Sequence, residues 1–321
     1  MLSRPDVSLV VIAFNEEDTV ADCIRALLAQ VGGHSIEVLA VDDGSTDRTA
    51  DVVRSFTELD PRVRLLAHDQ NRGRGAARRT GQDAALAPLV GYVDADVVVP
   101  PDWLQRCIVA LQHHSAVSGI ATPDGDCVYL ARVIKPTARL RRHTSPISGG
   151  NVLFEAEALR QVGFAENFRL GEDFRLARRM AAKGFSVVTV ADLVAEHREA
   201  KSYRASILWL WQNGLDAARL PFEFRTVRIP DIVWAGWLAA LLALLALGSV
   251  GTIPWLEVLA GAALVTIVVA IGHTASRFRP WPRAGRWVVA ATLDVPIIAA
   301  YLAGRTVGLP AALWLVRHRS V

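Results

Sequence analysis

Apolar and polar positions divide the chain into two parts with different patterns. Residues 7–14 form a nearly continuous apolar, β-branched run, which is typical of a buried parallel strand. A polar turn follows, and the next apolar residues recur at helical spacing with acidic residues near their start. The same order of strand, polar turn and helix recurs from residue 36 and from residue 62, and a further strand pattern covers 89–96. This alternation predicts an α/β fold with a doubly wound, Rossmann-like, mostly parallel sheet.

From residue 232 onward, long apolar stretches replace the alternating pattern. Residues 232–250 carry no charge, and these 19 residues at helical rise can cross a hydrocarbon core roughly 30 Å thick. Similar segments cover about 255–272 and 287–303, although Asp294 and Pro296 interrupt the third. We therefore expect a soluble domain over 1–200, an amphipathic interfacial segment over 201–228 and an α-helical transmembrane region over 229–321.

Polar residues gather where the predicted strands end. Because ligands bind α/β sheets at the carboxyl ends of their strands, four such clusters at successive strand ends predict a binding site. A turn or a helix cap can explain any single cluster. The clusters are Asn15 and Glu16; Asp42 and Asp43; Asn71, Arg72 and Gly73; and Asp94 and Asp96.

Asp94 and Asp96 stand where a strand pattern would normally place apolar residues. Two acids one residue apart on a strand point to the same face, since side chains alternate with a period of two. Paired carboxylates suit a hard divalent cation such as Mg²⁺ or Mn²⁺. The alternative interpretation is a strand that ends in a solvated, acidic turn.

Charge and composition limit the kinds of molecule that the protein is expected to bind. The net charge of +3 is modest, and arginines gather near the apolar half, which favours lipid headgroups or phosphates over nucleic acid.

The distribution of arginines also predicts the membrane topology. Four arginines lie in 276–286 and none in 251–254, so the positive-inside rule predicts a multi-pass protein of the cell membrane with a cytoplasmic N-terminal domain. We expect no secretory signal, because the first apolar run is short and acids follow it. The three cysteines show no metal spacing and are expected to be reduced thiols.

Six segments together resemble family 2 glycosyltransferases with the GT-A fold. In chain order they are "VIAFNEEDTV", "VDDGSTDRT", "NRGRGAARRTG", "VDADVVVPPDWL", "SGGNVLFEAEAL" and "LGEDFRLARRM". The resemblance covers roughly residues 7–200 and implies an inverting transferase of hexosyltransferase type that uses a nucleotide-sugar donor. A UDP-sugar is favoured over a GDP-sugar.

The resemblance also implies roles for individual residues. The donor-binding residues would be Phe14, Asn15, Glu16, Asp42, Asp43, Arg72, Arg78, Asp94 and Ala95, with Asp42 accepting hydrogen bonds from the nucleotide base. Arg79 departs from the asparagine that is common in the family at its position. Asp94 and Asp96 would hold ribose and the Mg²⁺ or Mn²⁺ ion, and His197 matches the position of a third metal ligand in some GT-A enzymes.

Catalysis and the acceptor are assigned in the same way. Asp173 would be the base that removes the proton of an acceptor hydroxyl, with Glu172 beside it, although an acid-rich helix start is the alternative. Gly149, Gly150 and Asn151 would shape the acceptor side. The Gln-x-x-Arg-Trp signature of processive synthases is absent around Gln212, which favours transfer of one sugar. A basic run over 132–146 suggests a flap toward an anionic acceptor, or only a solvated charged face.

These expectations define one leading function and two alternatives. The leading function is a membrane-anchored, metal-dependent, non-processive inverting glycosyltransferase that acts on a lipid or lipid-linked acceptor. In the first alternative the acceptor is a polyprenyl phosphate, whose nucleophile is already anionic and needs no strong base. In the second, the chain is a non-catalytic membrane scaffold that only binds a nucleotide.

Overall fold

The computed structural model describes residues 4–123, 147–164, 171–198, 203–225, 227–277 and 284–318. The described residues form two compact units. The first contains the described residues up to 198, and the second contains those from 203 onward. The basic run over 132–146 lies outside the described residues, so its role as a flap remains a prediction.

The first unit is built on an eight-stranded mixed sheet with the order β3-β2-β1-β4-β7-β6-β8-β5. β1, β2, β3 and β4 are parallel, β7 is antiparallel to β4 and to β6, and β8 is parallel to β6 and antiparallel to β5. The strands are β1 (Val7–Ala13), β2 (Ile36–Asp42), β3 (Val63–Ala67), β4 (Leu89–Asp94), β5 (Val97–Val98), β6 (Ala116–Pro123), β7 (Asn151–Glu155) and β8 (Val187–His197).

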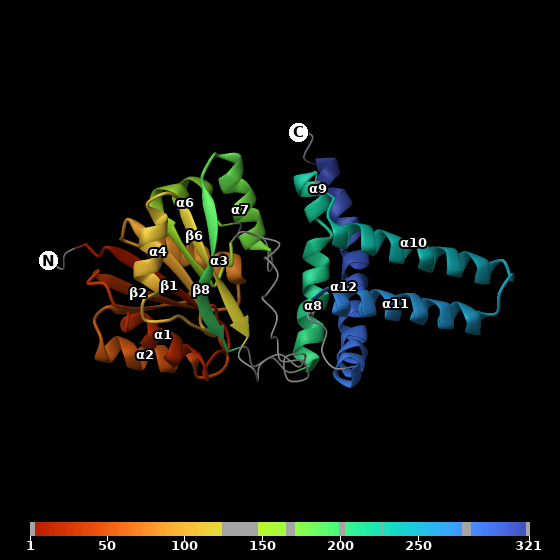
Figure 1. Cartoon of the computed structure of the whole chain (residues 1–321), viewed down its shortest axis with the longest axis horizontal. Helices are drawn as coiled ribbons and strands as arrows, with labels where there is room; N and C mark the ends of the chain where they lie inside the picture. Colours follow the sequence, from red (N-terminus) through yellow and green to blue (C-terminus); the bar gives the residue numbers. More distant parts are fainter. Residues whose placement is uncertain are drawn as a thin grey trace. The chain divides into compact units, whose positions relative to one another are not determined.

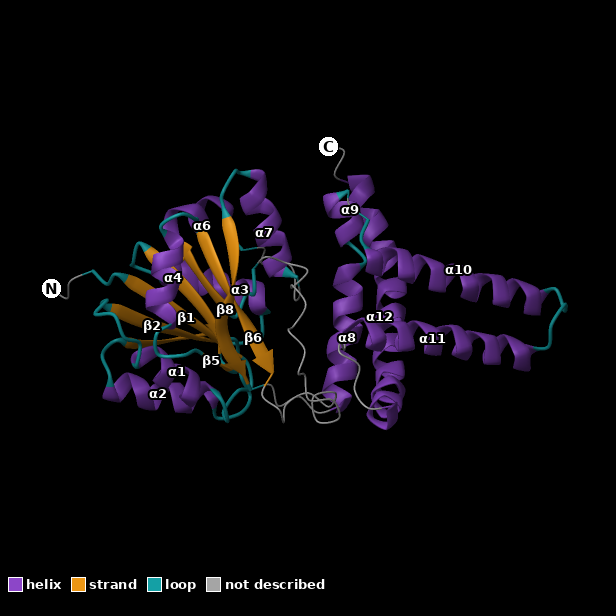
Figure 2. Ribbon diagram, viewed as in Figure 1, coloured by secondary structure: helices purple, strands orange, loops and turns teal. Residues whose placement is uncertain are grey.

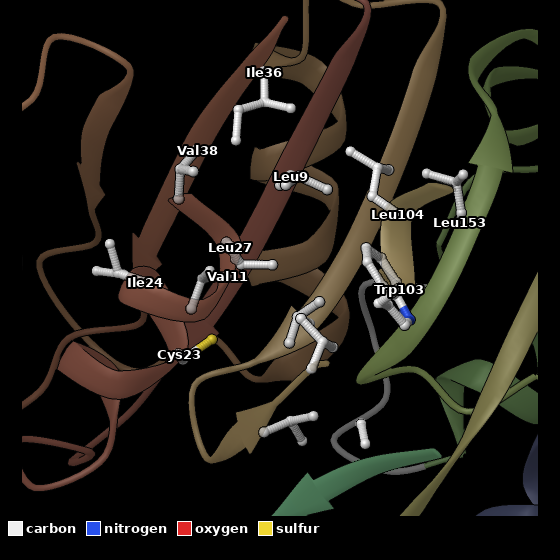
Figure 3. Close-up of a cluster of buried hydrophobic side chains, with 14 of the residues drawn as sticks. Leu9, Val11, Cys23, Ile24, Leu27, Ile36, Val38, Trp103, Leu104 and Leu153 are labelled. Carbon is white, nitrogen blue, oxygen red and sulfur yellow. The ribbon is translucent and has the colours of Figure 1, made fainter. Parts of the chain in front are cut away.

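Helices cover both faces of this sheet (Figures 1 and 2). They are α1 (Val20–Leu28), α2 (Thr49–Leu59), α3 (Arg74–Ala84), α4 (Trp103–Leu111), α6 (Ala156–Val162) and α7 (Glu172–Ala182). Apolar side chains of α1, α2 and α4 form one core with the sheet, and Figure 3 shows Ile24, Leu27, Trp103 and Leu104 packed against strand residues there. Residues of α3, α6 and α7 form a second core on the opposite face. This three-layer arrangement confirms the predicted α/β fold class.

The sheet is mostly parallel, as predicted, with β7 antiparallel to β4 and β6 and β5 antiparallel to β8. One detail differs from the expectations. β4 ends at Asp94, and Asp96 lies in the turn that precedes β5. The two acids therefore do not share one strand face, since side-chain alternation holds only within a strand.

The second unit is helical. It contains α8 (Tyr203–Ala217), α9 (Leu220–Phe224), α10 (Ile229–Ser249), α11 (Trp255–Arg277) and α12 (Ala284–His318). Three of these helices have windows long and apolar enough to cross a membrane, namely 229–249, 255–273 and 292–314. α12 continues through Pro296 and Pro310, so the third apolar segment extends beyond its predicted end at 303.

α8 packs closely along α12 because glycines, which have no side chain, lie where the two helices meet. A Cβ on Gly214 of α8 would collide with the carbonyl oxygen of Tyr301, and one on Gly308 of α12 would lie 2.6 Å from the carbonyl oxygen of Leu215. These approaches bring the two backbones into direct contact. The segment predicted to be interfacial is thus held by the last apolar helix.

Candidate active site

The parallel strands bring three sequence-distant positions to one edge of the sheet. In the register of the sheet, Ala13 pairs with Asp42, and Ile12 pairs with Asp94. The carboxyl ends of β1, β2 and β4 therefore lie side by side. Asp42 is 4% exposed and accepts a hydrogen bond at 3.3 Å from the backbone N–H of Ser45.

The loops that follow β1 and β2 are tied to each other. Asn15 adopts a positive φ of 57°, its backbone N–H donates to Ser45 Oγ at 2.9 Å, and its Oδ1 accepts from the backbone N–H of Thr46 at 2.8 Å. The backbone N–H of Glu16 donates to Thr49 Oγ1 at 2.8 Å. Phe14 remains 43% exposed beside them. The predicted base-binding residues Phe14, Asn15, Glu16 and Asp42 are thus brought together.

Asp43 has a different environment from Asp42. Its carboxylate lies 2.7 Å from Nδ1 of His68 and accepts hydrogen bonds from the backbone N–H groups of Arg72 and Gly73 at 2.9 and 2.8 Å. His68 Nε2 lies 2.9 Å from Thr80 Oγ1, so the ring is held on both sides. These contacts fix the loop that contains the exposed Arg72. Asp43 thereby supports the predicted donor site from within the fold.

Arg78 joins two acidic motifs that are far apart in the sequence. Its guanidinium group, 1% exposed, donates to Asp94 Oδ1 at 2.8 Å and also to Glu172 Oε1. Burial lowers the pKa of this guanidinium, but the carboxylates of Asp94 and Glu172 outweigh that effect and raise it. Arg78 therefore remains a cation that holds the end of β4 against the start of α7.

Two glycines allow this ion pair to form. A Cβ on Gly149 would lie 2.7 Å from Nη2 of Arg78, and one on Gly150 would collide with the carboxylate of Asp94. The backbone N–H of Asp94 donates to the carbonyl oxygen of Gly150 at 3.3 Å, which continues the pairing of β4 with β7. Any other residue at either position would push the loop away from Asp94 and Arg78.

Asn151 lies next to these glycines, but its side chain points into the core. It is fully buried, its Oδ1 accepts from Trp103 Nε1 at 2.7 Å, and its Nδ2 donates to the carbonyl oxygen of Ile120 at 3.3 Å. Ala95 is likewise buried, and its backbone N–H donates to the carbonyl oxygen of Ile12. Both residues shape the site through the backbone that they anchor.

Asp173 lies in the first turn of α7, beside the Arg78 pair. Burial raises the pKa of its carboxyl group to about 6, and the neighbouring Glu172 carboxylate adds to this, while Arg78 opposes it. Its Oδ1 accepts from the backbone N–H of Phe174 at 2.7 Å. A carboxylate with this pKa is largely ionised at neutral pH and is basic enough to accept a proton.

Asp96 and His197 meet through strand pairing. β5 pairs with β8 so that Val97 lies opposite His197, and the backbone N–H of Arg198 donates to the carbonyl oxygen of Asp96 at 2.6 Å. This register places His197 Nε2 3.1 Å from Asp96 Oδ2. Asp96 is 6% exposed and His197 is partly exposed.

The donor set of Asp96 and His197 fits a divalent ion. Two neighbouring ligands about 2.1 Å from an octahedral ion lie about 3 Å apart, close to the separation observed between these two side chains. Within the described ranges there is no group of three or more His, Cys, Asp or Glu side chains arranged to hold a metal. The two residues would leave most coordination positions for phosphate oxygens and water. Asp94, in contrast, is engaged by Arg78.

The contacts of His68 with Asp43 and Thr80, and the bridging ion pairs of Arg78, were not predicted from the sequence. His68 directly follows β3, so the rule used for the other strand ends would have found it. Arg74 and Arg78 are four residues apart on α3 and thus share a face. Although burial lowers the pKa of the Arg74 guanidinium, Asp94 and Glu172 raise it overall. The spacing of these two arginines therefore indicated that α3 has a positively charged face, which the structure directs toward Asp94 and Glu172.

Comparison with known proteins identifies related sequences. The pattern of "Glycosyl transferase family 2" matches residues 8–168, which are 161 of the 321 residues, and that of "Glycosyl transferase family group 2" matches residues 89–272. The succinoglycan biosynthesis protein ExoO of Rhizobium meliloti is 37% identical over 202 residues, which cover 56% of this chain and 57% of ExoO. ExoU of the same organism is 29% identical over 199 residues, which cover 56% of this chain and 58% of ExoU. The matched part thus spans a little over half the length of these relatives.

Two solved structures share the fold over most of this chain. The mannosyltransferase PcManGT from Pyrobaculum calidifontis, in complex with GDP-Man and Mn²⁺, has a TM-score of 0.60 at 24% identity and covers 94% of this chain and 88% of its own. S. aureus TarS 1–349, in complex with UDP-GlcNAc, has a TM-score of 0.51 at 13% identity and covers 94% and 90%. At sequence identities of 24% and 13%, the similarity to these two structures shows a shared fold only.

Proposed function

Because this chain belongs to glycosyl transferase family 2, we propose that it moves one sugar from a nucleotide-sugar donor to a hydroxyl group of a lipid or lipid-linked acceptor. The reaction inverts the configuration of the anomeric carbon and takes place at the cytoplasmic face of the membrane. The ion pairs of Arg78 with Asp94 and Glu172 carry this proposal, because they unite a donor-side and an acceptor-side motif in one site.

The donor nucleotide lies over the carboxyl ends of β1 and β2. Asp42 accepts hydrogen bonds from the N–H edge of the base, and Phe14 offers its exposed ring beside it. A uracil or a guanine edge provides such N–H groups, and a UDP-sugar is the first donor to test. Arg72, exposed on the loop that Asp43 fixes, is suited to the negative charge of the diphosphate.

A divalent ion would be held by Asp96 and His197, and it would supply positive charge to the departing nucleoside diphosphate. The 3.1 Å separation of their ligand atoms and the chemistry of the pair support this assignment. The protein itself fixes both side chains through the pairing of β5 with β8. Mg²⁺ and Mn²⁺ both suit a set of carboxylate and imidazole ligands.

Asp173 acts on the acceptor. Its carboxylate takes the proton of the acceptor hydroxyl while the hydroxyl oxygen bonds to the anomeric carbon and the bond from that carbon to the diphosphate oxygen breaks. Glu172 is neutralised by Arg78, so Asp173 remains as the proton acceptor of this pair. Its pKa of about 6 allows it to be ionised before the reaction and to hold the proton afterwards.

The apolar helices of the second unit anchor the enzyme in the membrane, with the catalytic unit on the cytoplasmic side. A lipid-linked acceptor would then be confined to the same surface as the enzyme. The name of ExoO, a succinoglycan biosynthesis protein, supports a place in the assembly of a cell-envelope polysaccharide. Gly149 and Gly150, which approach Arg78 and Asp94 too closely for any side chain, would face the acceptor sugar.

The test is a donor screen with the full-length protein in detergent. UDP-sugars and GDP-sugars are supplied with Mg²⁺ or Mn²⁺ and with lipid-linked acceptors, and release of the nucleoside diphosphate and formation of product are measured. NMR of the product reports the anomeric configuration. Transfer that persists in the double variant D94A/D96A, or a retained configuration, would overturn the proposal.

The variant D173N separates a hydroxyl from a phosphate acceptor. A polyprenyl phosphate is already anionic and reacts without a strong base, so substantial transfer by D173N would favour that alternative. A scaffold that only binds nucleotide would release no product with any donor. The pKa of Asp173, raised by burial and by the neighbouring Glu172 carboxylate, suits a base for a hydroxyl acceptor.

A further inference from the structure

The three apolar helices of the second unit are not equivalent. The apolar windows of α10 and α11 have a mean hydropathy of 2.1, and 6% and 11% of their residues are buried within the protein. The window of α12 has a mean hydropathy of 1.3, and 39% of it is buried. α10 and α11 therefore present nearly all of their apolar surface outward, as expected of helices in lipid, whereas protein covers a much larger share of α12.

α10 and α11 form an antiparallel hairpin whose register is defined by two contacts. A Cβ on Gly248 would lie 2.6 Å from a methyl group of Val258, and one on Gly261 would lie 3.1 Å from the methyl groups of Leu244. This register places Asp231, at the start of α10, level with His273, near the end of α11. The two residues thus mark the same end of the hairpin.

α12 contacts both of these residues from positions far apart on its own axis. Its Asp294 lies 2.8 Å from Nδ1 of His273, and its Arg305 donates to Asp231 at 2.5 Å. Eleven residues of α-helix correspond to about 16 Å along the axis. A helix that ran parallel to the hairpin would place these two contacts about 16 Å apart in depth. Because Asp231 and His273 are level, α12 must run across the hairpin.

The packing agrees with this crossing. The cluster between the helices contains Trp237 of α10, Ala270 of α11, and Ile298 and Leu302 of α12. These residues belong to the ends of the hairpin near Asp231 and His273 and to the middle of α12. Figures 1 and 2 show the hairpin leaving α12 at a steep angle, with α8 lying along α12.

Basic residues flank α12 on both sides. Arg277, Arg279, Arg283 and Arg286 precede its apolar window, and Arg317 and Arg319 follow it. The positive-inside rule assigns segments rich in Arg to the cytoplasmic side. Both ends of the α12 window therefore favour the same side of the membrane, which a spanning helix cannot satisfy.

We propose that, of the three apolar helices, α10 and α11 cross the bilayer while α12 lies along its cytoplasmic surface with α8 packed on it. Ile298 and Leu302 pack against the hairpin, and Leu309 and Leu313 continue the same helical face at spacings of seven and four residues. Leu313 is 47% exposed. Beyond the hairpin, this face contacts the lipid through Leu309 and Leu313, which makes α12 a surface-bound helix. The inference rests on the proposed membrane anchor.

The position of the C-terminus tests the topology. Green fluorescent protein, which fluoresces in the cytoplasm, and alkaline phosphatase, which is active outside it, are fused to full-length protein after Val321 in a Gram-negative host. The same reporters inserted at Gly251, in the exposed turn between α10 and α11, and fused before Met1 provide the references. We expect the two termini on the cytoplasmic side and the turn outside. A C-terminus on the side of the turn would overturn the inference and leave the anchor intact, whereas a turn on the side of the N-terminus would refute the anchor itself.

The depth of α12 in the bilayer provides a second measurement. Spin labels are placed singly at Val307, on the face away from the hairpin, and at Leu309 and Leu313, and their accessibility to a lipid-soluble and a water-soluble relaxing agent is compared. If α12 lies along the surface, the depth of a label in the bilayer depends on which face of the helix carries it. Labels at Leu309 and Leu313 should then be equally deep, and the label at Val307 should be shallower. A depth that changes steadily along the helix, regardless of the face, would show a spanning α12.

Discussion

Two buried arginines, one in each unit, differ in what surrounds them. Arg78 holds Asp94, whose side chain is 21% exposed, and Glu172, which adjoins Asp173. Arg305 donates to Asp231, which Arg228 already pairs at 3.0 Å, and to the carbonyl oxygens of Pro230 and Ala217. Next to Arg78, carboxylates remain at the edge of the candidate active site. Arg305 is instead surrounded by groups at the ends of helices. A buried cation can therefore organise chemistry in one unit and only helix packing in the other.

The variant D173N should produce the largest effect. Removing the proposed base is expected to lower the rate of transfer by about 10²- to 10⁴-fold while donor binding remains. In the unaltered enzyme the raised pKa makes Asp173 protonated below about pH 6, so the rate should rise with pH through that value and then level off. Steady-state kinetics across pH measure both. D192N, at an exposed acid of β8, is the matched control. A D173N enzyme with near-normal rates would reject the role of Asp173 as base.

The variant R78M should have the next largest effect. It leaves Asp94 and Glu172 without their cation, which costs about 3 to 5 kcal/mol in a buried pair, and we expect transfer to fall by roughly 10²-fold or more. Because Arg78 lowers the pKa of Asp173, the midpoint of the pH profile should also move upward. R79M, which removes a more exposed arginine paired with Asp83, should retain both rate and midpoint. An unshifted midpoint in folded R78M would mean that Arg78 does not act on the base.

A moderate effect is expected for H197A. Loss of one of two proposed ligands should raise the Mg²⁺ or Mn²⁺ concentration for half-maximal activity by roughly tenfold or more. Chelation should abolish transfer by the unaltered enzyme, and added metal should restore it. Activity is measured against free metal concentration, with H114A as the control at a histidine that lies 2.7 Å from Ser186 Oγ. An unchanged metal requirement in H197A would remove His197 from the metal site.

The smallest effect on catalysis is expected for R305M. Breaking its buried pair should cost the second unit about 3 kcal/mol of stability, seen as a lower melting temperature in detergent. Transfer per folded molecule should stay within about twofold of normal, because the Arg305 network contains no proposed catalytic group. R204M, at an exposed residue of α8, is the stability control. A large loss of turnover in folded R305M would show that Arg305, like Arg78, supports catalysis, and would contradict this difference between the two arginines.

The sequence predicted the fold and the clustering of polar residues more fully than it predicted their partners. The parallel strands β1, β2 and β4 were predictable because their apolar runs have a local pattern. The contact of Asp96 with His197 spans 101 residues and depends on the register of β5 with β8, which no local pattern encodes. Asn151 could be located within its motif, but its burial against Trp103 depends on the packing of α4.

The helical unit shows the same limit. Apolar windows in the sequence predicted three helices by length and composition, which are local properties. The crossing of α12 depends on the contacts of Asp294 and Arg305 with residues of other helices. Asp294 was noticed only as an interruption of an apolar segment, because a charge in such a segment does not indicate which helix will pair with it.

The pairing of β5 with β8 also determines when the proposed metal site can form during synthesis. β1 to β4 can begin to associate as they leave the ribosome, but His197 follows Asp96 by 101 residues and belongs to the last strand of the sheet. The proposed metal site is therefore completed only when β8 has been translated, about 30 residues before the first apolar helix, α10, begins at Ile229. In the proposed membrane-anchored transferase, the site would thus be complete only shortly before the first apolar helix could enter the membrane, which would limit the time in which an unanchored enzyme could consume donor sugar.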